Sequence, residues 1–475
     1  MTGRIIWRSS ISKEDMTGGH KSFMAAITRK KDTLMTEGAI WKNILLFALP
    51  LMLGNIFQQL YNTVDSIVVG NFVGKEALAA VGTTDSIINT FIGFFSGLAT
   101  GSGIIISQYF GEKNEKGVHD AVHTTIALTF LMSLICTACA ILLVPAFLHM
   151  MGTPKDVFEQ SAVYLRIYFA GSMGLLFYNM GAGILRAVGD SRRPLYFLIF
   201  SALLNIVLDL FFVAYLGLGV AGVAWATIIS QGASAILIMA ALSRETESYR
   251  VIWREVRINP VMTRKIFQIG LPSALQMAVT SFSNVFVQSY INHFGSAAMA
   301  GWSSYGKIDK FCLLPIQSIS MGVTTFVGQN LGAGKLDRVK QSTRVGLMIS
   351  LGIALVIIVP VWLAAGSLVR LFNQSPDVLS YGTLFVRLEM PFYFALCINQ
   401  IYAGTLRGVG NTKAPMVIMM SCFIVFRQVY LFSVSHITES IIWVALGYPF
   451  GWILCSLCLV LYFRHTNLEK YRVAG

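Results

Sequence analysis

Twelve long apolar runs, separated by short polar breaks, constrain this chain more than any other feature of its sequence. A membrane-spanning helix needs about 20 mostly apolar residues. The first six runs lie at about 42–70, 84–110, 119–147, 157–185, 194–216 and 220–242. The second six lie at about 264–292, 303–330, 341–366, 377–406, 414–434 and 440–463. The pattern predicts an all-α polytopic membrane protein with twelve transmembrane helices.

The composition excludes a soluble globule. Of the 475 residues, 55% are hydrophobic and only 12% are charged, whereas soluble domains carry about 25% charged residues. The apolar content is spread along the whole chain and is not gathered into cores separated by polar linkers. Membrane lipid is therefore an expected partner.

The net charge of +13 reflects topology rather than nucleic-acid binding. If the N-terminus lies inside, most of the 36 Lys and Arg residues fall in segments on that same side. An excess of basic residues in short loops marks the cytoplasmic side of a membrane protein. The sequence thus predicts a multi-pass protein of the cell (plasma or inner) membrane with both termini cytoplasmic, and no nucleic-acid partner.

The two sets of six runs form an internal repeat. LRAVGDSRRP, which starts at Leu185, matches LRGVGNTKAP, which starts 221 residues later at Leu406. Because each copy holds an even number of spans, both copies enter the membrane from the same side, as parallel repeats do. The predicted units are a cytoplasmic tail (1–41), an N-terminal six-helix lobe (42–242), a cytoplasmic linker (243–263), a C-terminal six-helix lobe (264–463) and a cytoplasmic tail (464–475).

Four polar residues stand inside spans of the first copy, where an ionisable group is costly and usually functional. Asp65 lies in the first span, Asn205 and Asp209 share a face of the fifth, and Thr227 lies in the sixth. The aligned residues of the second copy, which are all apolar or aromatic, are Phe286 or Val287, Phe426, Tyr430 and Tyr448.

This one-sided polarity suggests a site for a proton or a sodium ion. Two carboxylates on one cavity favour a bound cation, because burial and mutual repulsion disfavour the ion-free, doubly charged state. In the alternative interpretation, Asp65 lies near the outer water interface and Asp209 is an ordinary buried carboxyl held by hydrogen bonds. The sequence does not distinguish H+ from Na+.

Other candidates are weaker. Gln58 and Tyr61 share a helical face with Asp65 and are predicted to contact substrate near the ion. Glu389 has no acidic counterpart in the first copy and is a second ionisable candidate, whereas Asp309 is expected to be solvated near the outer end of its span.

Two prolines occupy equivalent places in the two copies. Pro50 and Pro272 lie in the first span of each lobe, where each removes a backbone hydrogen bond and permits a gate or a fixed kink.

Motifs for catalysis, nucleotide binding and metal binding are missing from the sequence. It holds no GxSxG or HExxH string and no true phosphate loop. His119 and His123 flank a helix start without an acidic or cysteine partner nearby, so no metal site is predicted. Gly93, Gly97 and Gly101 have GxxxG spacing and are predicted to permit close helix packing. We therefore expect no catalytic residues and no cofactor beyond the coupling ion.

Several motifs, in order, resemble the multidrug and toxic compound extrusion (MATE) transporters. They are LPLMLGNIFQQLYNTVDSIVVGNFVGKEALAAVG from Leu49, SQYFGEKN, GQNLGAGK, and the paired LRAVGDSRRP and LRGVGNTKAP. The resemblance runs from about Met35 to about Tyr462. It implies two six-helix lobes in a V-shaped transporter, which exports organic, often cationic and aromatic, compounds in exchange for a cation.

The resemblance also implies which lobe holds the ion. Asp65, Asn205, Asp209 and Thr227 match the ligands of the branch whose cation site lies in the N-terminal lobe. That branch has a further Asn on the fourth helix, for which Asn179 is the nearest candidate here. Another branch uses an acidic pair on the seventh and tenth helices, but here the seventh span has no acid.

The predicted function is secondary active multidrug efflux by alternating access, in antiport with H+ or Na+, by a protein that is expected to be a monomer. Its substrates would be drug-like small molecules. The alternative is a lipid-linked precursor flippase of the same superfamily, which would need a strongly cationic central cavity. A membrane-embedded lipid-modifying enzyme fits less well, because no nucleophile–base or metal-ligand cluster is visible.

Overall fold

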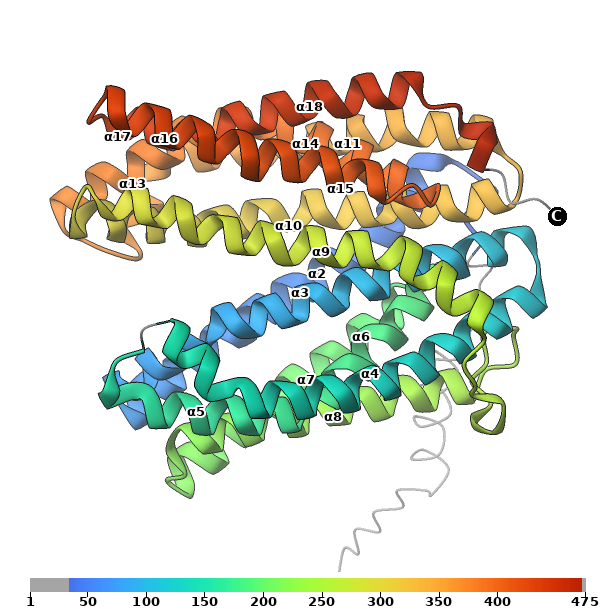
Figure 1. The fold of residues 1–475 in the computed structure, drawn as a ribbon, viewed down its shortest axis with the longest axis horizontal. Coiled ribbons are helices and arrows are strands. Elements are labelled where there is room, and N and C mark those ends of the chain that lie inside the picture. Colours follow the sequence, from blue (N-terminus) through green and yellow to red (C-terminus); the bar gives the residue numbers. More distant parts are fainter. Residues whose placement is uncertain (1–33, 152, 472–475) are drawn as a thin grey trace, which may run out of the picture. The chain divides into compact units, whose positions relative to one another are not determined.

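A computed structural model describes residues 34–151 and 153–471, which are helical almost throughout and contain no strand (Figure 1). Most of the predicted N-terminal tail and the end of the C-terminal tail lie outside these described residues. The long helices arise where the sequence is continuously apolar, because a buried backbone in lipid must satisfy its hydrogen bonds within each helix.

The first half of the described chain holds seven α-helices and two π-helical turns. They are α2 (Ile40–Val68), η1 (Val69–Val73), α3 (Lys75–Glu112), α4 (Glu115–Met150), α5 (Lys155–Ala170), α6 (Ser172–Ala187), α7 (Arg192–Asp209), η2 (Leu210–Tyr215) and α8 (Gly219–Ser243). A linker follows, with one 3-10 turn, η3 (Trp253–Glu255).

The second half repeats this plan. It comprises α9 (Pro260–Asn292), α10 (Ser296–Gly332), α11 (Leu336–Leu363), α12 (Ala365–Arg370), α13 (Pro376–Glu389), η4 (Met390–Phe392), α14 (Tyr393–Gly408), α15 (Lys413–Met420), η5 (Ser421–Phe426), α16 (Arg427–Ile437), α17 (Ile441–Ala445), α18 (Gly447–His465) and η6 (Leu468–Tyr471). Because successive passes alternate in direction, the loops at 113–114, 188–191, 244–259, 333–335 and 409–412 lie at one end, which we call the linker end.

These elements correspond to the twelve predicted spans, several of which are interrupted, the twelfth among them at Leu446 between α17 and α18. In the part of the chain that is described, nine helical segments are long and apolar enough to cross a membrane on their own. The fourth predicted span breaks at Gly171, and the tenth breaks at the 3-10 turn Met390–Phe392, its counterpart in the repeat. The seventh, α9, is long enough but carries many Ser, Thr, Gln and Asn residues.

The repeated loops have the same backbone conformation in both halves. Gly189 and Gly410 adopt φ values of 92° and 89°, which favour glycine. In each loop the next residue's N–H donates to a leucine carbonyl, Asp190 to Leu185 O and Asn411 to Leu406 O, both at 2.9 Å. This is the helix-ending arrangement of a Schellman motif, and it explains why this string recurs in the sequence.

The two halves exchange their first helices in part. The beginning of α2, through Ile44 and Phe47, belongs to an apolar cluster with Val323 and Phe326 of α10. The beginning of α9, through Met262 and Ile266, belongs instead to a cluster of the first half. Each half is therefore completed by a segment of the other.

The predicted glycine stripe of α3 lies at this junction and packs against α9. A Cβ atom added to Gly97 would lie 2.3 Å from Ala274 Cα, and one added to Gly101 would lie 2.3 Å from Gly270 Cα. Small residues let helix backbones approach closely in lipid. The prediction of a packing role is thus confirmed for Gly97 and Gly101, and the structure adds that the packing joins the two halves.

We expect Gly101→Ala to lower the apparent melting temperature of the purified protein. The added methyl group would overlap backbone atoms of α9, and overpacking of this kind costs about 1–3 kcal/mol. Gly93→Ala on the same stripe is the control, because its nearest neighbour, Met277 Cβ, would lie 3.7 Å away. Equal melting temperatures of the two variants would contradict this account.

Candidate cation and substrate site

Asp65, Asn205 and Asp209 form one buried cluster inside the first half. Asp65 is 9% exposed, Asn205 1% and Asp209 0%. Both neighbours of the Asn205 amide are acceptors, so its nitrogen is the atom that faces them. It donates to Asp65 Oδ1 at 2.8 Å and to Asp209 Oδ2 at 3.2 Å. A single amide thus bridges two carboxyl groups that come from different helices.

The local structure explains how the two acids meet. Asp209 is the last residue of α7 and is followed directly by the π-helical turn η2, while Asp65 stands one turn before the π-helical turn η1. Such turns widen a helix and occur often at functional sites. The Asn205 amide therefore holds the side chains of Asp65 and Asp209 on opposite sides of one bridging group.

Thr227 lies at the level of this cluster on α8. The Ser201 hydroxyl of α7 donates to Ser230 O of α8 at 2.8 Å. Because α7 and α8 are antiparallel, this register places Thr227 beside Asn205. The Thr227 hydroxyl donates to Val223 O at 2.9 Å, and the residue is 2% exposed, so its oxygen retains lone pairs with which to accept a hydrogen bond or bind a cation.

Of the three residues predicted to line the substrate path, only Tyr61 lies near the acidic cluster. Tyr61 interacts electrostatically with Asp65 and Asp209, and with two further tyrosines of α5. Gln58 is exposed. Asn179 donates to Leu175 O of its own helix at 3.0 Å, so its amide serves α6 rather than the carboxylates.

Pro50 and Pro272 lie within the continuous helices α2 and α9, and both are buried. Their equivalent places in the exchanged first helices agree with the repeat. Their role as a gate or kink stays a prediction.

A second polar cluster lies in the other half, around Asp309, which is partly exposed. Asp309 accepts hydrogen bonds from the hydroxyls of Tyr305, at 3.3 Å, and Tyr393. Asp309 is therefore bonded to two tyrosines as well as partly exposed, so the prediction of solvation is right only in part. Tyr393 comes from α14, far along the chain, so the sequence around Asp309 gave no sign of this partner.

Glu389 belongs to this second cluster together with a basic residue. It is 0% exposed and interacts electrostatically with Asp309 and Arg427. The guanidinium of Arg427 lies 4.0 Å from the centre of the Tyr448 ring, a cation–π contact. The second half thus places a basic residue close enough to Glu389 for electrostatic interaction.

Two glutamines join the halves symmetrically at the linker end. Gln108 of α3 donates to Gly408 O at 3.0 Å, and Gln329 of α10 donates to Ala187 O at 2.9 Å. Both donors and both acceptors are related by the shift of 221 residues, so the two hydrogen bonds are equivalent. We call this pair of hydrogen bonds the clasp. A cavity of ≈ 40 Å³ lies beside it, lined by Arg186 and residues of α3, α6 and α10.

Comparison with known proteins gives a family match. The sequence model of the MatE family matches residues 50–211 and again 272–432. The two matches cover equivalent parts of the two halves, which agrees with the repeat inferred from the paired loops.

Related proteins match over nearly the whole chain. The probable multidrug resistance protein YoeA of Bacillus subtilis is 29% identical, over 94% of this chain and 97% of its own length. The probable multidrug resistance protein YpnP of the same organism is also 29% identical, over 92% and 98%. The outward-facing structure of a multidrug resistance MATE family transporter shares the fold, with a TM-score of 0.86, 24% identity and coverage of 93% and 99%.

We expect Asn205→Ala to destabilise the protein, because it removes the one amide that bridges two buried carboxyl groups. A buried acceptor left without its partner costs about 1–3 kcal/mol. Thermal unfolding in detergent at mildly alkaline pH measures the effect. Asn179→Ala is the matched control, since its amide bonds only within its own helix. Equal losses in both variants would argue against the bridge.

Proposed function

Because the chain belongs to the MatE family, we propose that it is a secondary active multidrug efflux transporter, which exchanges drug-like organic compounds for H+ or Na+. The observation that carries this proposal is the amide-bridged carboxyl pair, Asp65 and Asp209, buried in one half only. Family membership bears out the prediction of a transporter rather than an enzyme.

The difference between the two polar clusters supports the first half as the coupling site. In the second half, Glu389 interacts electrostatically with Arg427, a basic residue of the same half. In the first half, the Asn205 amide donates to both carboxyl groups, and Tyr61 lies one turn before Asp65 on the same helix. Two buried carboxyl groups that share one amide disfavour the doubly charged state, and a bound proton or sodium ion neutralises the pair. Glu389 remains the second ionisable candidate.

Coupling follows from differential affinity. A proton or Na+ held by Asp65, Asn205 and Asp209, with Thr227 as a further oxygen ligand, neutralises the cluster and changes the relative stability of the two access states. Ion and drug then affect each other's binding reciprocally, without direct contact. Tyr61 extends the site toward a substrate path that we assign to Gln58 and, less directly, to Asn179.

The clasp of Gln108 and Gln329 is the element that must open when the transporter changes its access. We place the linker end on the cytoplasmic side of the cell membrane, because the basic loops lie there. Pro50 and Pro272, in the exchanged first helices, are placed to let each helix bend as the clasp parts. The monomer is the proposed functional unit, since each half already completes the other.

The flippase alternative is not favoured. It would require a strongly cationic central cavity for a pyrophosphate group, whereas the family match and the multidrug resistance relatives support drug export. A lipid-modifying enzyme is equally unsupported by the family match.

We expect Asp65→Asn and Asp209→Asn each to abolish ion-driven drug efflux, because an amide does not take up a proton and no longer attracts Na+. Dye efflux from proteoliposomes, under an imposed pH gradient or an imposed Na+ gradient, measures this and identifies the ion. Asp337→Asn, at an exposed position on α11, should leave efflux unchanged. Undiminished transport by the Asp65 variant would refute the assignment.

We expect Gln108→Leu combined with Gln329→Leu to favour the state that is open at the linker end. Each lost hydrogen bond is worth about 0.5–1.5 kcal/mol, so the populations should shift by about tenfold or more. Spin labels at Lys116 and Lys340, on a background without reactive native cysteines, report the distance between the halves. Gln341→Leu, at an exposed position, is the control. A distance distribution identical to that of the parent protein would show that the clasp does not hold the halves together.

A further inference from the structure

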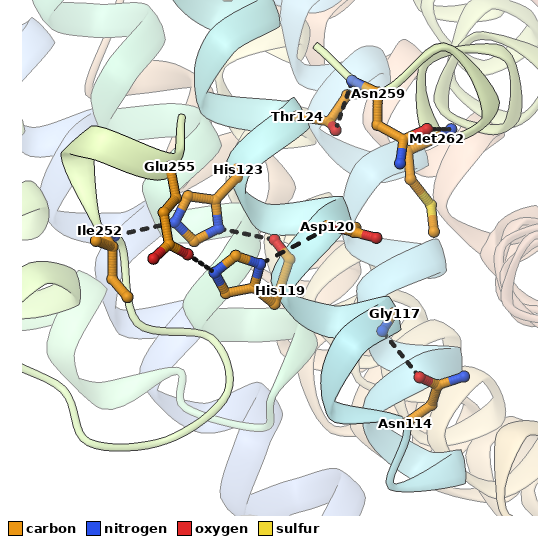
Figure 2. A network of polar contacts seen from close by, with 10 residues as sticks. All are labelled: Asn114, Gly117, His119, Asp120, His123, Thr124, Ile252, Glu255, Asn259 and Met262. Atoms are coloured by element: carbon orange, nitrogen blue, oxygen red, sulfur yellow. Dashed lines mark hydrogen bonds and ion pairs between the residues drawn. The ribbon is translucent and has the colours of Figure 1, made fainter. Parts of the chain in front are cut away.

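Two histidines at the beginning of α4 face a glutamate of the linker (Figure 2). His119 and His123 lie one turn apart on the same side of the helix, and their rings stack with centroids 3.9 Å apart. Glu255, in the turn η3, places a carboxylate oxygen 2.7 Å from His119 Nε2. Local sequence does not reveal Glu255 as a partner of these histidines, because it comes from the linker more than a hundred residues later.

The ring nitrogens are oriented as in metal-binding histidines. His123 Nδ1 bonds to the His119 carbonyl oxygen at 2.8 Å, and His119 Nδ1 faces an Asp120 carboxylate oxygen at 3.9 Å. His123 Nε2 accepts the Ile252 N–H at 3.0 Å, so it carries the lone pair and the ring proton is on Nδ1. A histidine that binds a metal usually donates its other N–H to a carbonyl or carboxylate in this way.

The donor atoms are close enough for one ion. One atom from each of His119, His123 and Glu255 lies within 4.8 Å of the other two. Two imidazoles and one carboxylate are a donor set for Zn2+, which binds nitrogen and oxygen at about 2.0–2.2 Å, whereas Ca2+ and Mg2+ prefer oxygen alone. The side chains of His119 and Glu255 are 31% and 52% exposed, so water can reach a fourth position.

The repeat provides an internal control. At the shift of 221 residues, His119 and His123 correspond to Lys340 and Arg344, which are both exposed. The helix start therefore does not itself require histidines. They occur in the half over which the linker passes, and the linker supplies the acid.

We propose that His119, His123 and Glu255 bind one divalent transition-metal ion, with Zn2+ the best fit, which fastens the linker to α4. The linker already contacts this helix through the Asn259 N–H, which donates to Thr124 Oγ1 at 3.3 Å. Binding requires the Ile252 N–H to release His123 Nε2, because the metal takes the same lone pair. The ion thus replaces the hydrogen bond between the Ile252 N–H and His123 Nε2 with metal–ligand bonds that join Glu255 of the linker to the two histidines of α4.

Calorimetric titration of the full chain with ZnCl2 tests the proposal, using protein without a histidine tag and stripped with a chelator. We expect one equivalent to bind, with affinity at least tenfold lower in each of His119→Gln, His123→Gln and Glu255→Gln. His149→Gln, at the far end of α4, is the matched control and should bind like the parent. Absence of binding, or equal affinity in all variants, overturns the site.

Hydrogen exchange at the Ile252 amide distinguishes a metal site from a simple ion pair. Zinc should accelerate hydrogen exchange of the Ile252 N–H in the parent protein. It should have no effect in His123→Gln, because in that variant the Ile252 N–H has already lost the imidazole that accepts its hydrogen bond. Unchanged exchange in the parent at saturating zinc would show that His123 is not a ligand and would overturn the three-residue site. Both readouts are independent of drug transport, so they stand apart from the proposed efflux function.

Discussion

The contact of α3 with α10 at the linker end is the constraint on which the rest of the molecule depends. A Cβ atom added to Gly111 would lie 1.9 Å from Gln329 O, and one added to Gly332 would lie 1.9 Å from Gln108 O. Backbone therefore meets backbone on the axis that relates the halves, and no side chain fits between them. The glutamines that flank these glycines turn the close approach into a specific, two-fold contact.

The symmetric frame carries an asymmetric charge distribution. Glu389 and Tyr168 occupy equivalent positions in the repeat, as do Tyr448 and Thr227. Residues of the two polar clusters therefore lie at equivalent positions of the two halves. In one cluster Glu389 and Asp309 lie with an arginine and several tyrosines, and in the other Asp65 and Asp209 share an amide. The duplicated scaffold thus carries different polar groups in its two halves.

The sequence predicted the helices well because lipid demands long apolar runs, and each predicted span corresponds to an observed helix or broken helix. It did not predict the breaks at Gly171 and Met390–Phe392, since an apolar run continues through both. Asp65, Asn205 and Asp209 could be predicted as a site because their counterparts in the other copy are apolar or aromatic. The tyrosine partner of Asp309 on α14 depends on tertiary packing that local sequence does not record.

The exchange of first helices has a consequence for the history of the chain. The segment before α2 is held by the other half, where Arg338 and Lys335 donate to the carbonyls of Gly38 and Thr36 at 3.0 and 2.9 Å. The segment before α9 is held by α4 in the same crosswise manner. An isologous dimer of six-helix subunits that exchange their first segments would show the same arrangement. The linker joins the two segment-exchanged subunits into one polypeptide. The sequences of the two halves could then diverge while the covalent connection kept them together.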